Sequence, residues 1–361
     1  MYSGRISRLA KILAGLNAVA VISPSSDMFY LTGLRLMADE RLTACIIRPD
    51  GPAEMILPAL YSEQVARSAP RLRQLVWTDG ENPYTVLAAR LREMGLDTVL
   101  VDEHMWCGHL LALQSALPEA EWGSASIPVR QLRRVKDSME IAELRRAAEI
   151  IDSAVMRTIY EVRPGMTERH LAEVLESNIV AGGGEGVSFP PLVGSGPNSA
   201  LPHYQAGDRV IREGDPVVID AGCVAGGYCS DTTRTVLVGR EPEGYLDIYR
   251  IVLRAYQAAL ASVRPGVACR EIDRVARGVI GDSGYGQHFI HRTGHGIGLD
   301  VHEEPFIVEG NGQILEVGMT FSIEPGIYLP GRFGARVEDI ILVTETGGVS
   351  LNTSARELMR L

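Results

Sequence analysis

Paired cysteines are missing from this sequence. Its five cysteines are odd in number, widely spaced and without a C-x-x-C pair, and they stand at Cys45, Cys107, Cys223, Cys229 and Cys269. This pattern indicates neither a disulfide framework nor a zinc ribbon. A reducing cytoplasm is the location that such cysteine usage favours.

Long apolar runs are absent as well. No stretch approaches the ~20 continuous apolar residues that would span a bilayer. An apolar segment near the N-terminus follows Arg5, Arg8 and Lys11, but polar residues interrupt it and no small-residue cleavage site follows. We therefore predict an N-terminal helix rather than a signal peptide, and no membrane partner.

Positive charge is also scarce. The chain has 35 Lys and Arg against 45 Asp and Glu, a formal net charge of −10. Such a charge repels a phosphate backbone, and no Lys/Arg-dense stripe reverses it locally, so we expect no nucleic-acid partner. The apolar fraction of 46% and the charged fraction of 22% are typical of a globular protein.

The length of 361 residues exceeds the usual domain size of about 100–200 residues. The first part of the chain alternates helical patterns with short apolar strands, which is typical of a small α/β domain. The predicted strands include Ala18–Ile22, Thr43–Arg48 and Thr98–Val101.

A basic, strand-poor segment begins at Ile127, and Asp137 or Ser138 followed by Glu140 is typical of the cap of a long helix. We therefore predict a domain boundary in this segment. The two predicted domains are residues 1–126 and 127–361.

The second part contains an internal repeat. The sequence V-R-P-G occurs at 162–165 and again at 263–266, each time between two helical patterns. Further along, an apolar strand ends in Asp220 in one copy and in Glu324 in the other, and 324 minus 220 is 104. Each copy therefore predicts two helices followed by a strand that ends in a carboxylate.

A second strand follows in each copy, 230–238 with Asp231 and 335–343 with Glu338. The period is too long for a solenoid, and two copies suit a pseudo-twofold domain whose halves share one sheet. The four carboxylates would then converge on the concave face of the sheet. Because burial of an unpaired carboxylate costs several kcal/mol, a cation is expected among them.

A glycine-rich segment, H-R-T-G-H-G-I-G at 291–298, adds His295 to these carboxylates, and its glycines indicate a close backbone approach. Four carboxylates and one imidazole suit hard divalent ions such as Mn²⁺, and they also allow Co²⁺ or Zn²⁺. Two ions would balance the four negative charges better than one.

The order Asp220, Asp231, His295, Glu324, Glu338 resembles the pita-bread metallopeptidase family, which contains methionine aminopeptidases, aminopeptidase P and prolidase. The matching motifs are I-D-A-G at 219–222, S-D-T-T-R-T at 230–235, H-R-T-G-H-G-I-G-L-D-V-H-E-E-P at 291–305, I-E-P-G at 323–326 and A-R-V-E-D at 335–339. Y-L-T-G at 30–33 extends the resemblance into the first domain and favours the proline-directed branch. The implied fold is α/β (α+β), with a creatinase/prolidase-like N-terminal domain and a pita-bread catalytic domain with a curved sheet.

The resemblance also implies roles for the ligands. Asp220 and Asp231 would bind one ion, Asp231 and Glu338 would bridge, and His295 with Glu324 would complete the other ion. A bridging water or hydroxide would attack the peptide bond. Glu324 would carry its proton to the leaving nitrogen.

Five further residues are candidates near the substrate. His302 would donate to the scissile carbonyl oxygen and His203 would sit beside the proline. Arg336 would orient metal-bound carboxylates, with a surface strand residue as the alternative. Asp39 and Glu40, which we expect to lack a basic partner nearby in sequence, would receive the α-ammonium group, with solvated loop acids as the alternative.

The expected activity is hydrolysis of the Xaa-Pro bond in a dipeptide, with a homodimer implied by the resemblance. The alternatives are aminopeptidase P acting on longer peptides, or a non-peptide amidohydrolase or lyase on the same scaffold. A binding-only relative is disfavoured, because all five ligand positions are present.

Overall fold

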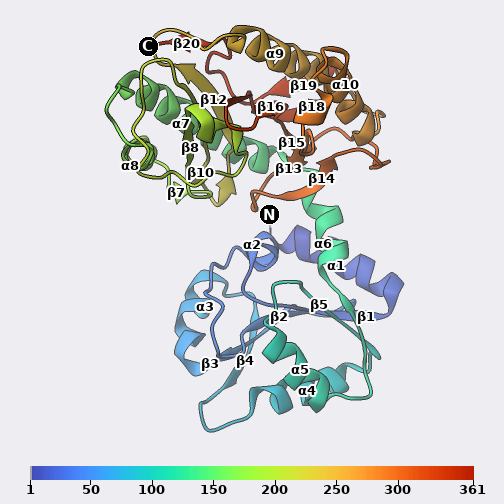
Figure 1. The fold of residues 1–361 in the computed structure, drawn as a ribbon. Coiled ribbons are helices and arrows are strands. Elements are labelled where there is room, and N and C mark those ends of the chain that lie inside the picture. Colours follow the sequence, from blue (N-terminus) through green and yellow to red (C-terminus); the bar gives the residue numbers. More distant parts are fainter. Residues whose placement is uncertain (1) are drawn as a thin grey trace. The chain divides into compact units, whose positions relative to one another are not determined.

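The structure is a computed structural model in which residues 2–361 are described, and the chain divides into two units (Figure 1). The N-terminal unit ends at Arg133 and the C-terminal unit comprises Arg134–Leu361. Among the described residues, no helix combines the length and the apolar character that a membrane crossing needs.

The boundary lies later than the one that we placed after residue 126. That position falls in α6 (Ser126–Arg133), which belongs to the N-terminal unit. Arg133 Nη1 donates to Asp27 Oδ1 at 2.7 Å with both side chains buried, and Val129 is fully buried. These contacts fasten the helix to the first unit despite its basic composition.

The N-terminal unit is a six-stranded sheet with helices on both faces. Its strands are β1 (Ala18–Ile22), β2 (Ala44–Ile47), β3 (Glu54–Pro58), β4 (Arg73–Trp77), β5 (Thr98–Val101) and β6 (Glu121–Ser124). Its other helices are α1 (Tyr2–Leu16), α2 (Ser26–Thr32), the 3₁₀ turn η1 (Ala59–Tyr61), α3 (Ser62–Ser68), α4 (Pro83–Met94) and α5 (Cys107–Ala116). The predicted N-terminal helix and the three predicted strands all occur.

The sheet order is β4-β3-β2-β1-β5-β6, with β1–β2 and β2–β3 antiparallel and the other pairs parallel. Leu91 of α4 and Leu113 of α5 pack against Val19 and Ile56 of the sheet. Figure 1 shows α1 on the opposite face. The inner strands β1 and β2 are buried along their whole length, which explains why their sequences are continuous apolar runs. The edge strands β4 and β6 are largely exposed or only partly buried.

The C-terminal unit contains four long helices and fourteen short strands. The helices are α7 (Ser138–Glu161), α8 (Glu168–Ala181), α9 (Tyr245–Ser262) and α10 (Cys269–Asp282), with 3₁₀ turns η2 (Gly196–Ala200) and η3 (Gly286–His288). The strands of the first half are β7 (Gly186–Val187), β8 (Leu192–Ser195), β9 (Pro216–Ala221), β10 (Cys223–Ala225), β11 (Tyr228–Cys229) and β12 (Thr232–Leu237). Those of the second half are β13 (Gly294–Gly296), β14 (Glu303–Ile307), β15 (Thr320–Ile323), β16 (Gly326–Leu329), β17 (Phe333–Arg336), β18 (Asp339–Thr344), β19 (Gly347–Ser350) and β20 (Met359–Arg360).

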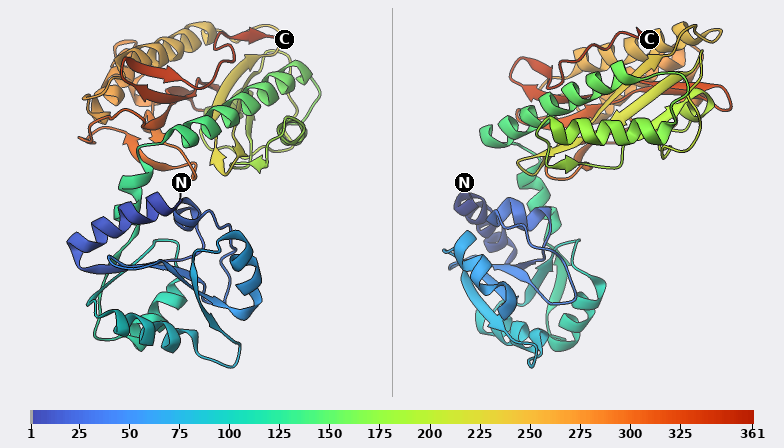
Figure 2. Two further views of the ribbon diagram at one scale, coloured as in Figure 1. Left: turned by 180° about the vertical axis from the view of Figure 1, so that it is seen from behind. Right: turned by 90° about the vertical axis from the view of Figure 1, so that its left-hand side faces the viewer.

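The expected duplication is visible in the hydrogen bonds. Gly165 N donates to Ile211 O at 2.9 Å, and in the second copy Gly266 N donates to Leu315 O at 2.9 Å. Both glycines have positive φ, 97° and 87°, which explains why the V-R-P-G turn ends in glycine. Figure 2 shows the paired helices of each half side by side, α7 with α8 and α9 with α10.

Each half has its own core and its own sheet. The first half packs α7 and α8 on the sheet β20-β12-β9-β8, and the second packs α9 and α10 on β14-β13-β15-β18-β19. An isolated bridge between Thr233 and Glu338 joins the two sheets. The carboxylate-bearing strand ends therefore meet at the seam between the halves.

Two local predictions have different outcomes. Asp137 caps α7 and forms the predicted capping box with Glu140. The predicted strand 335–343 is instead two strands, because β17 pairs with β16 whereas β18 pairs with β15 and β19. The chain switches partner at Val337 and Glu338, a break that an uninterrupted apolar pattern cannot reveal.

Candidate metal centre

Five side chains from five chain segments converge at the seam between the two halves. Asp220 lies in β9, Asp231 immediately before β12, His295 in β13, Glu324 immediately after β15 and Glu338 immediately before β18. Four of the five residues are buried and Glu324 is partly buried. The strand ends supply the convergence because β12 pairs antiparallel with β9, and β15 with β18.

The distances are those of a shared ion site. Asp231, His295 and Glu338 each present one ligand atom within 4.8 Å of the others. His295 Nε2 lies 3.6 Å from Asp231 Oδ2 and 3.4 Å from Glu324 Oε1. These spacings leave room for a cation between the side chains.

Three buried carboxylate oxygens in this cluster have no hydrogen-bond partner. They are Asp220 Oδ1, Asp231 Oδ1 and Glu338 Oε1. A buried carboxylate oxygen without a donor is costly. The residues present therefore fit divalent metal ions, which would satisfy all three oxygens.

The orientation of His295 also fits a metal ligand. Its Nδ1 faces the carbonyl oxygen of Gly296 at 3.1 Å, so Nδ1 carries the hydrogen and Nε2 offers its lone pair to the carboxylate cluster. Burial lowers the pKa of His295 to about 3. The imidazole is therefore neutral near pH 7, as metal binding requires.

Mutual repulsion marks the acidic members. Burial raises the pKa of Asp231 well above its usual value, and the nearby Glu338 and Asp220 raise it further. Burial and the charges of Glu324 and Asp220 do the same for the pKa of Glu338. The pKa of Glu324 is raised to about 7, again chiefly by burial. Without cations these carboxyl groups retain protons, as is expected of a site that binds cations.

Arg336 lies against the cluster. Its Nη2 donates to Asp220 Oδ2 at 2.5 Å and its Nε donates to Thr233 Oγ1 at 2.9 Å. Thr233 Oγ1 in turn donates to Glu338 Oε2 at 2.7 Å. Arg336 is buried, so the alternative of a surface strand residue is wrong. Its hydrogen bonds hold carboxylates from both halves, directly for Asp220 and through Thr233 for Glu338.

His291, whose role the sequence left open, has two partners. Its Nδ1 faces the Arg292 carbonyl oxygen at 2.7 Å and its Nε2 faces Tyr328 Oη at 2.8 Å. Nδ1 therefore carries the hydrogen, and Tyr328 donates to Nε2 while accepting from Arg336 Nη1 at 2.9 Å. Tyr328 was not predicted, because its partners are separated from it by up to 37 residues.

At two glycines near the site the backbone of a neighbouring segment comes very close, as the glycine-rich sequence predicts. A Cβ added to Gly294 would lie 1.8 Å from the carbonyl oxygen of Ser322, and one added to Gly222 would lie 1.9 Å from that of Ser230. Any side chain there would push apart the strands that carry His295 and Asp231.

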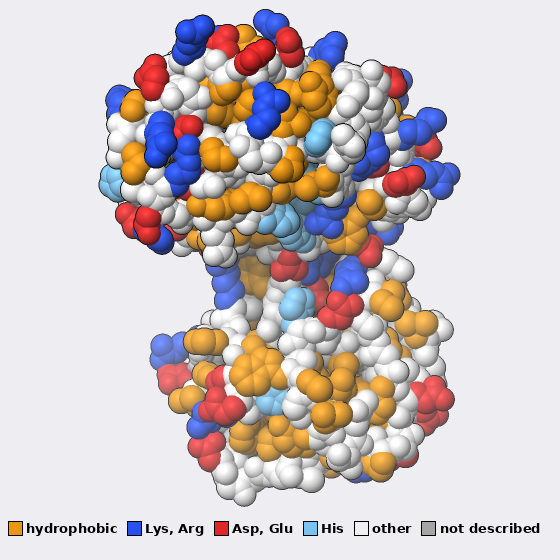
Figure 3. Space-filling model, in the orientation of Figure 1, with side chains coloured by type: hydrophobic (Ala, Val, Ile, Leu, Met, Phe, Trp, Pro, Cys, Tyr) orange, Lys and Arg blue, Asp and Glu red, His pale blue; other side chains and the backbone are white. Residues whose placement is uncertain are grey.

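The cluster opens into a pocket of about 600 Å³. Asp220, Asp231, His295, Glu324 and Glu338 all line it, together with His203, His302, Arg292 and the apolar residues Phe189, Pro190, Leu192, Pro202 and Val301. On the C-terminal unit, Figure 3 shows histidine side chains beside apolar and basic ones. The pocket is of the size and mixed character that small substrates need.

His203 and His302 are exposed in the pocket wall. The ring of His302 stands edge-on to that of His295, with centroids 4.2 Å apart. Partial burial lowers the pKa of His302, and the charge of Arg292 lowers it further. A neutral imidazole beside the ligands has one N–H available for a substrate oxygen.

Arg292 is a pocket residue that sequence reasoning missed. Its guanidinium lies 4.7 Å from the centroid of the Phe306 ring, and it forms no ion pair with any residue in 2–361. Half-burial lowers its pKa. An arginine in this position can bind an anionic group of a ligand.

Asp39 and Glu40 belong to the N-terminal unit. The expectation that they lack a basic neighbour is wrong, because Arg41 Nη1 pairs with Glu40 Oε1 at 2.6 Å. Asp39 Oδ2 accepts from Tyr61 Oη at 2.6 Å. Both carboxylates therefore already have local partners.

Comparison with known proteins gives two family matches. Residues 142–345 match Metallopeptidase family M24, and residues 5–135 match the Creatinase/Prolidase N-terminal domain. Together they cover both units of the structure.

Individual relatives match over nearly the whole chain. The chain is 44% identical to the probable dipeptidase PepE of Mycobacterium tuberculosis, over 96% of this chain and 92% of that protein. The solved prolidase of Thermococcus sibiricus is 39% identical with a TM-score of 0.95, covering 100% of this chain and 99% of that one. The Xaa-Pro dipeptidase of Bacillus anthracis is 32% identical with a TM-score of 0.93, covering 100% of both chains.

Proposed function

We propose that this chain, which belongs to metallopeptidase family M24, is an Xaa-Pro dipeptidase that depends on two divalent metal ions. The fold is the pita-bread fold that the sequence predicted. The observation that carries the proposal is the convergence of four carboxylates and His295 with three buried carboxylate oxygens left without donors.

Asp220, Asp231, His295, Glu324 and Glu338 would hold the ions. We propose Mn²⁺ as the native metal because the donors are mainly hard oxygens, with Co²⁺ and Zn²⁺ as alternatives. When bound, the ions would lower the pKa of water and polarise the scissile carbonyl.

The remaining steps are assigned to side chains. Glu324, whose Oε1 faces the site, would take a proton and deliver it to the proline nitrogen. His302 would donate to the carbonyl oxygen as negative charge develops there. His203 and the apolar wall of Phe189 and Pro190 would contact the proline ring.

Arg292 is the reason for preferring a dipeptide to a longer substrate. Four carboxylates balance two divalent ions, and Arg336 is engaged with Asp220. The charge of Arg292 is therefore free to bind the terminal carboxylate of the substrate, which lies next to the scissile bond only in a dipeptide. Aminopeptidase P activity, with the same ligands and a longer peptide, is the alternative.

A non-peptide amidohydrolase or lyase would use the same metal ligands. Only the substrate that is turned over distinguishes such an enzyme from an Xaa-Pro dipeptidase. Three further proposals stand: Asp39 and Glu40, which follow the Y-L-T-G segment, receive the α-ammonium group; the protein is a homodimer, as the resemblance implies; and it works in the cytoplasm, as the cysteine usage favours. The first now requires these acids to exchange their contacts with Tyr61 and Arg41 for substrate.

The test is a substrate panel on the Mn²⁺-loaded protein. Ala-Pro, Ala-Pro-Ala and Met-Ala are compared at equal concentration, and release of the N-terminal residue is measured. We expect turnover of Ala-Pro well above that of the other two. Preference for Ala-Pro-Ala would favour aminopeptidase P, and turnover of none would favour a non-peptide substrate.

A further inference from the structure

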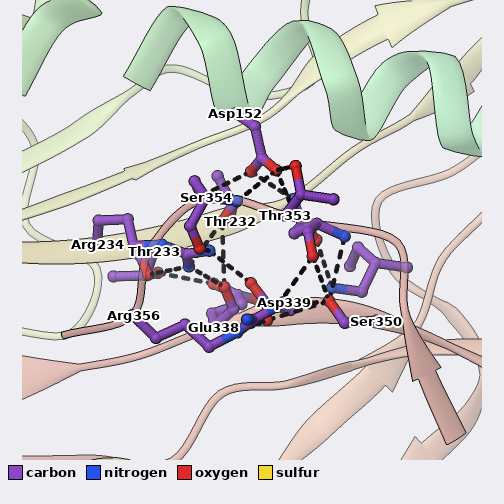
Figure 4. A network of polar contacts seen from close by, with 12 residues as sticks. Asp152, Thr232, Thr233, Arg234, Glu338, Asp339, Ser350, Thr353, Ser354 and Arg356 are labelled. Atoms are coloured by element: carbon purple, nitrogen blue, oxygen red, sulfur yellow. Dashed lines mark hydrogen bonds and ion pairs between the residues drawn. The ribbon is translucent and has the colours of Figure 1, made fainter. Parts of the chain in front are cut away.

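A buried polar network contains Glu338 and its neighbour Asp339 (Figure 4). At its centre is Arg234, which follows Asp231 by three positions in β12 and is 2% exposed. Its Nη1 donates to the main-chain oxygen of Glu338 at 2.7 Å, and its Nη2 donates to Asp339 Oδ1 at 2.7 Å and to Ser354 O at 3.1 Å. One guanidinium thus grips the Glu338 backbone and two neighbours.

Every polar group of Glu338 has a hydrogen-bond partner except one carboxylate oxygen, Oε1. Arg234 fixes its carbonyl, its N–H donates to Thr233 O at 3.2 Å, and its Oε2 accepts from Thr233 Oγ1 at 2.7 Å. Only Oε1 is left without a donor. The hydrogen bonds therefore aim one oxygen toward the position of an ion.

Asp339 balances the charge of Arg234 but also accepts hydrogen bonds from other side chains. Its Oδ2 also accepts from Tyr256 Oη, from Arg356 Nε and from Ser350 Oγ, the last at 3.1 Å. The grip on Glu338 therefore depends on residues 350–356, which supply Ser350, Ser354 and Arg356.

Asp152 of α7 anchors this C-terminal loop. Its carboxylate accepts from Asn352 Nδ2 at 3.0 Å, Ser354 N at 3.0 Å and Ser354 Oγ at 2.9 Å, and also from the backbone and hydroxyl of Thr353. The side chain is buried, and within residues 2–361 it forms no ion pair. A buried carboxylate that serves only to hold a loop indicates that the position of that loop matters.

We propose that Arg234 and Asp152 are positioning residues for Glu338, and that the C-terminal loop 350–356 is part of the support of the metal centre. The inference rests on the proposed role of Glu338 as a bridging ligand. Asp152 fixes the loop, the loop places the Ser354 carbonyl, and that carbonyl with Asp339 sets the guanidinium that holds the Glu338 backbone. Loss of such an outer partner typically weakens metal binding about 10–100-fold.

The test is calorimetric titration of metal-stripped protein with Mn²⁺ alone. Asp152→Asn keeps the shape of the side chain but places an amide N–H₂ against the donors of the loop. We expect Mn²⁺ to bind about 10–100-fold more weakly, with the folded state retained. Ser354→Ala removes one of the hydrogen bonds to Asp152 and should shift the affinity in the same direction by less.

Asp215→Asn is the matched control. Asp215 is also a buried carboxylate of this unit, and its partners are Arg209 at 2.6 Å and the backbone of Arg212 at 2.8 Å, neither of which touches a ligand. The Asp215→Asn variant should have a lower melting temperature but the same Mn²⁺ affinity as the wild type. Wild-type Mn²⁺ affinity in both Asp152→Asn and Ser354→Ala, with lowered melting temperatures, would overturn the positioning role. Failure of the wild-type protein to bind Mn²⁺ would instead overturn the proposed function itself.

Discussion

Single residues around the pocket divide into those that would hold the ions and those that would hold the substrate. The convergence of the four carboxylates could be predicted from the sequence because a carboxylate at the end of an apolar strand is unusual and occurs here in duplicate. Arg292 and Tyr328 could not, since an arginine in a loop and a tyrosine in a strand have ordinary structural roles. For Asp39 and Glu40, only the expectation of no basic partner nearby in sequence is wrong, because the adjacent Arg41 pairs with Glu40.

His302 is predicted to act on the transition state. Replacement by Ala removes one N–H donor to the developing oxyanion, and loss of such a donor costs about 10²–10³ in kcat. The Mn²⁺ affinity of the same variant should stay near that of the wild type, since His302 is not among the ligands. Steady-state kinetics with Ala-Pro measures the first quantity, and an unchanged kcat would assign His302 a structural role.

Arg292 is predicted to select substrate length. Arg292→Met keeps an apolar side chain over Phe306 but removes the charge, so the ion pair with the terminal carboxylate is lost. A charged hydrogen bond contributes about 1.5–3 kcal/mol, so KM for Ala-Pro should rise about 10–150-fold. KM for Ala-Pro-Ala, whose carboxylate lies one residue further away, should change little. Equal effects on both peptides would remove Arg292 from substrate recognition.

At the scale of elements, the strand ends and not the strand interiors make the site. The repeat predicted the hairpins, since Asp220 and Glu324 are 104 residues apart and Asp231 and Glu338 are 107 residues apart, so each copy carries its two carboxylates at a similar spacing. It did not predict the switch between β17 and β18, nor the pairing of β13 with β14, because strand register depends on contacts between segments far apart in the sequence. These two features place Glu338 and His302.

The start of β14 is tied down by a buried ion pair. Lys136 Nζ lies 2.6 Å from Glu303 Oε1, with the two side chains 1% and 8% exposed. Lys136→Met should lower the free energy of unfolding by about 3–5 kcal/mol, because it leaves a buried carboxylate without that charge. Urea denaturation of the apo protein measures this loss.

The neighbouring pair Arg134–Glu316 is the control, since its nitrogen–oxygen distance is 3.3 Å and Glu316 is 54% exposed. Arg134→Met should cost less than about 1 kcal/mol. Comparable losses for the two variants would show that burial does not govern the contribution of the Lys136 pair.

At the scale of the whole molecule, the metal-free protein is predicted to lose stability as pH rises from about 6.5 to about 8. Burial raises the folded-state pKa of Glu324 from 4.5 to about 7, and those of Asp231 and Glu338 are raised as well. At these carboxyls the folded state binds more protons than the unfolded one, so their contribution to stability is full below about pH 4 and disappears as pH passes about 7. The pKa of His295, lowered from 6.5 to about 3, has the opposite effect, but only below about pH 6.5.

Bound ions should reverse that trend, because they require deprotonated ligands. Melting temperatures measured from about pH 5 to about pH 8, with EDTA and with Mn²⁺, should diverge as pH rises. A constant difference across this range would contradict the assignment of the buried carboxylates as a cation site.

The most direct test of the account is the turnover of Ala-Pro as metal-stripped protein is titrated with Mn²⁺. We expect negligible turnover without metal and a plateau when two ions are bound per chain, because the four carboxylates and His295 together would form a two-ion site. Asp231→Asn, which removes a shared ligand, should show no such rise. Full activity of the stripped protein, or of Asp231→Asn, would contradict a metal-dependent mechanism at these residues.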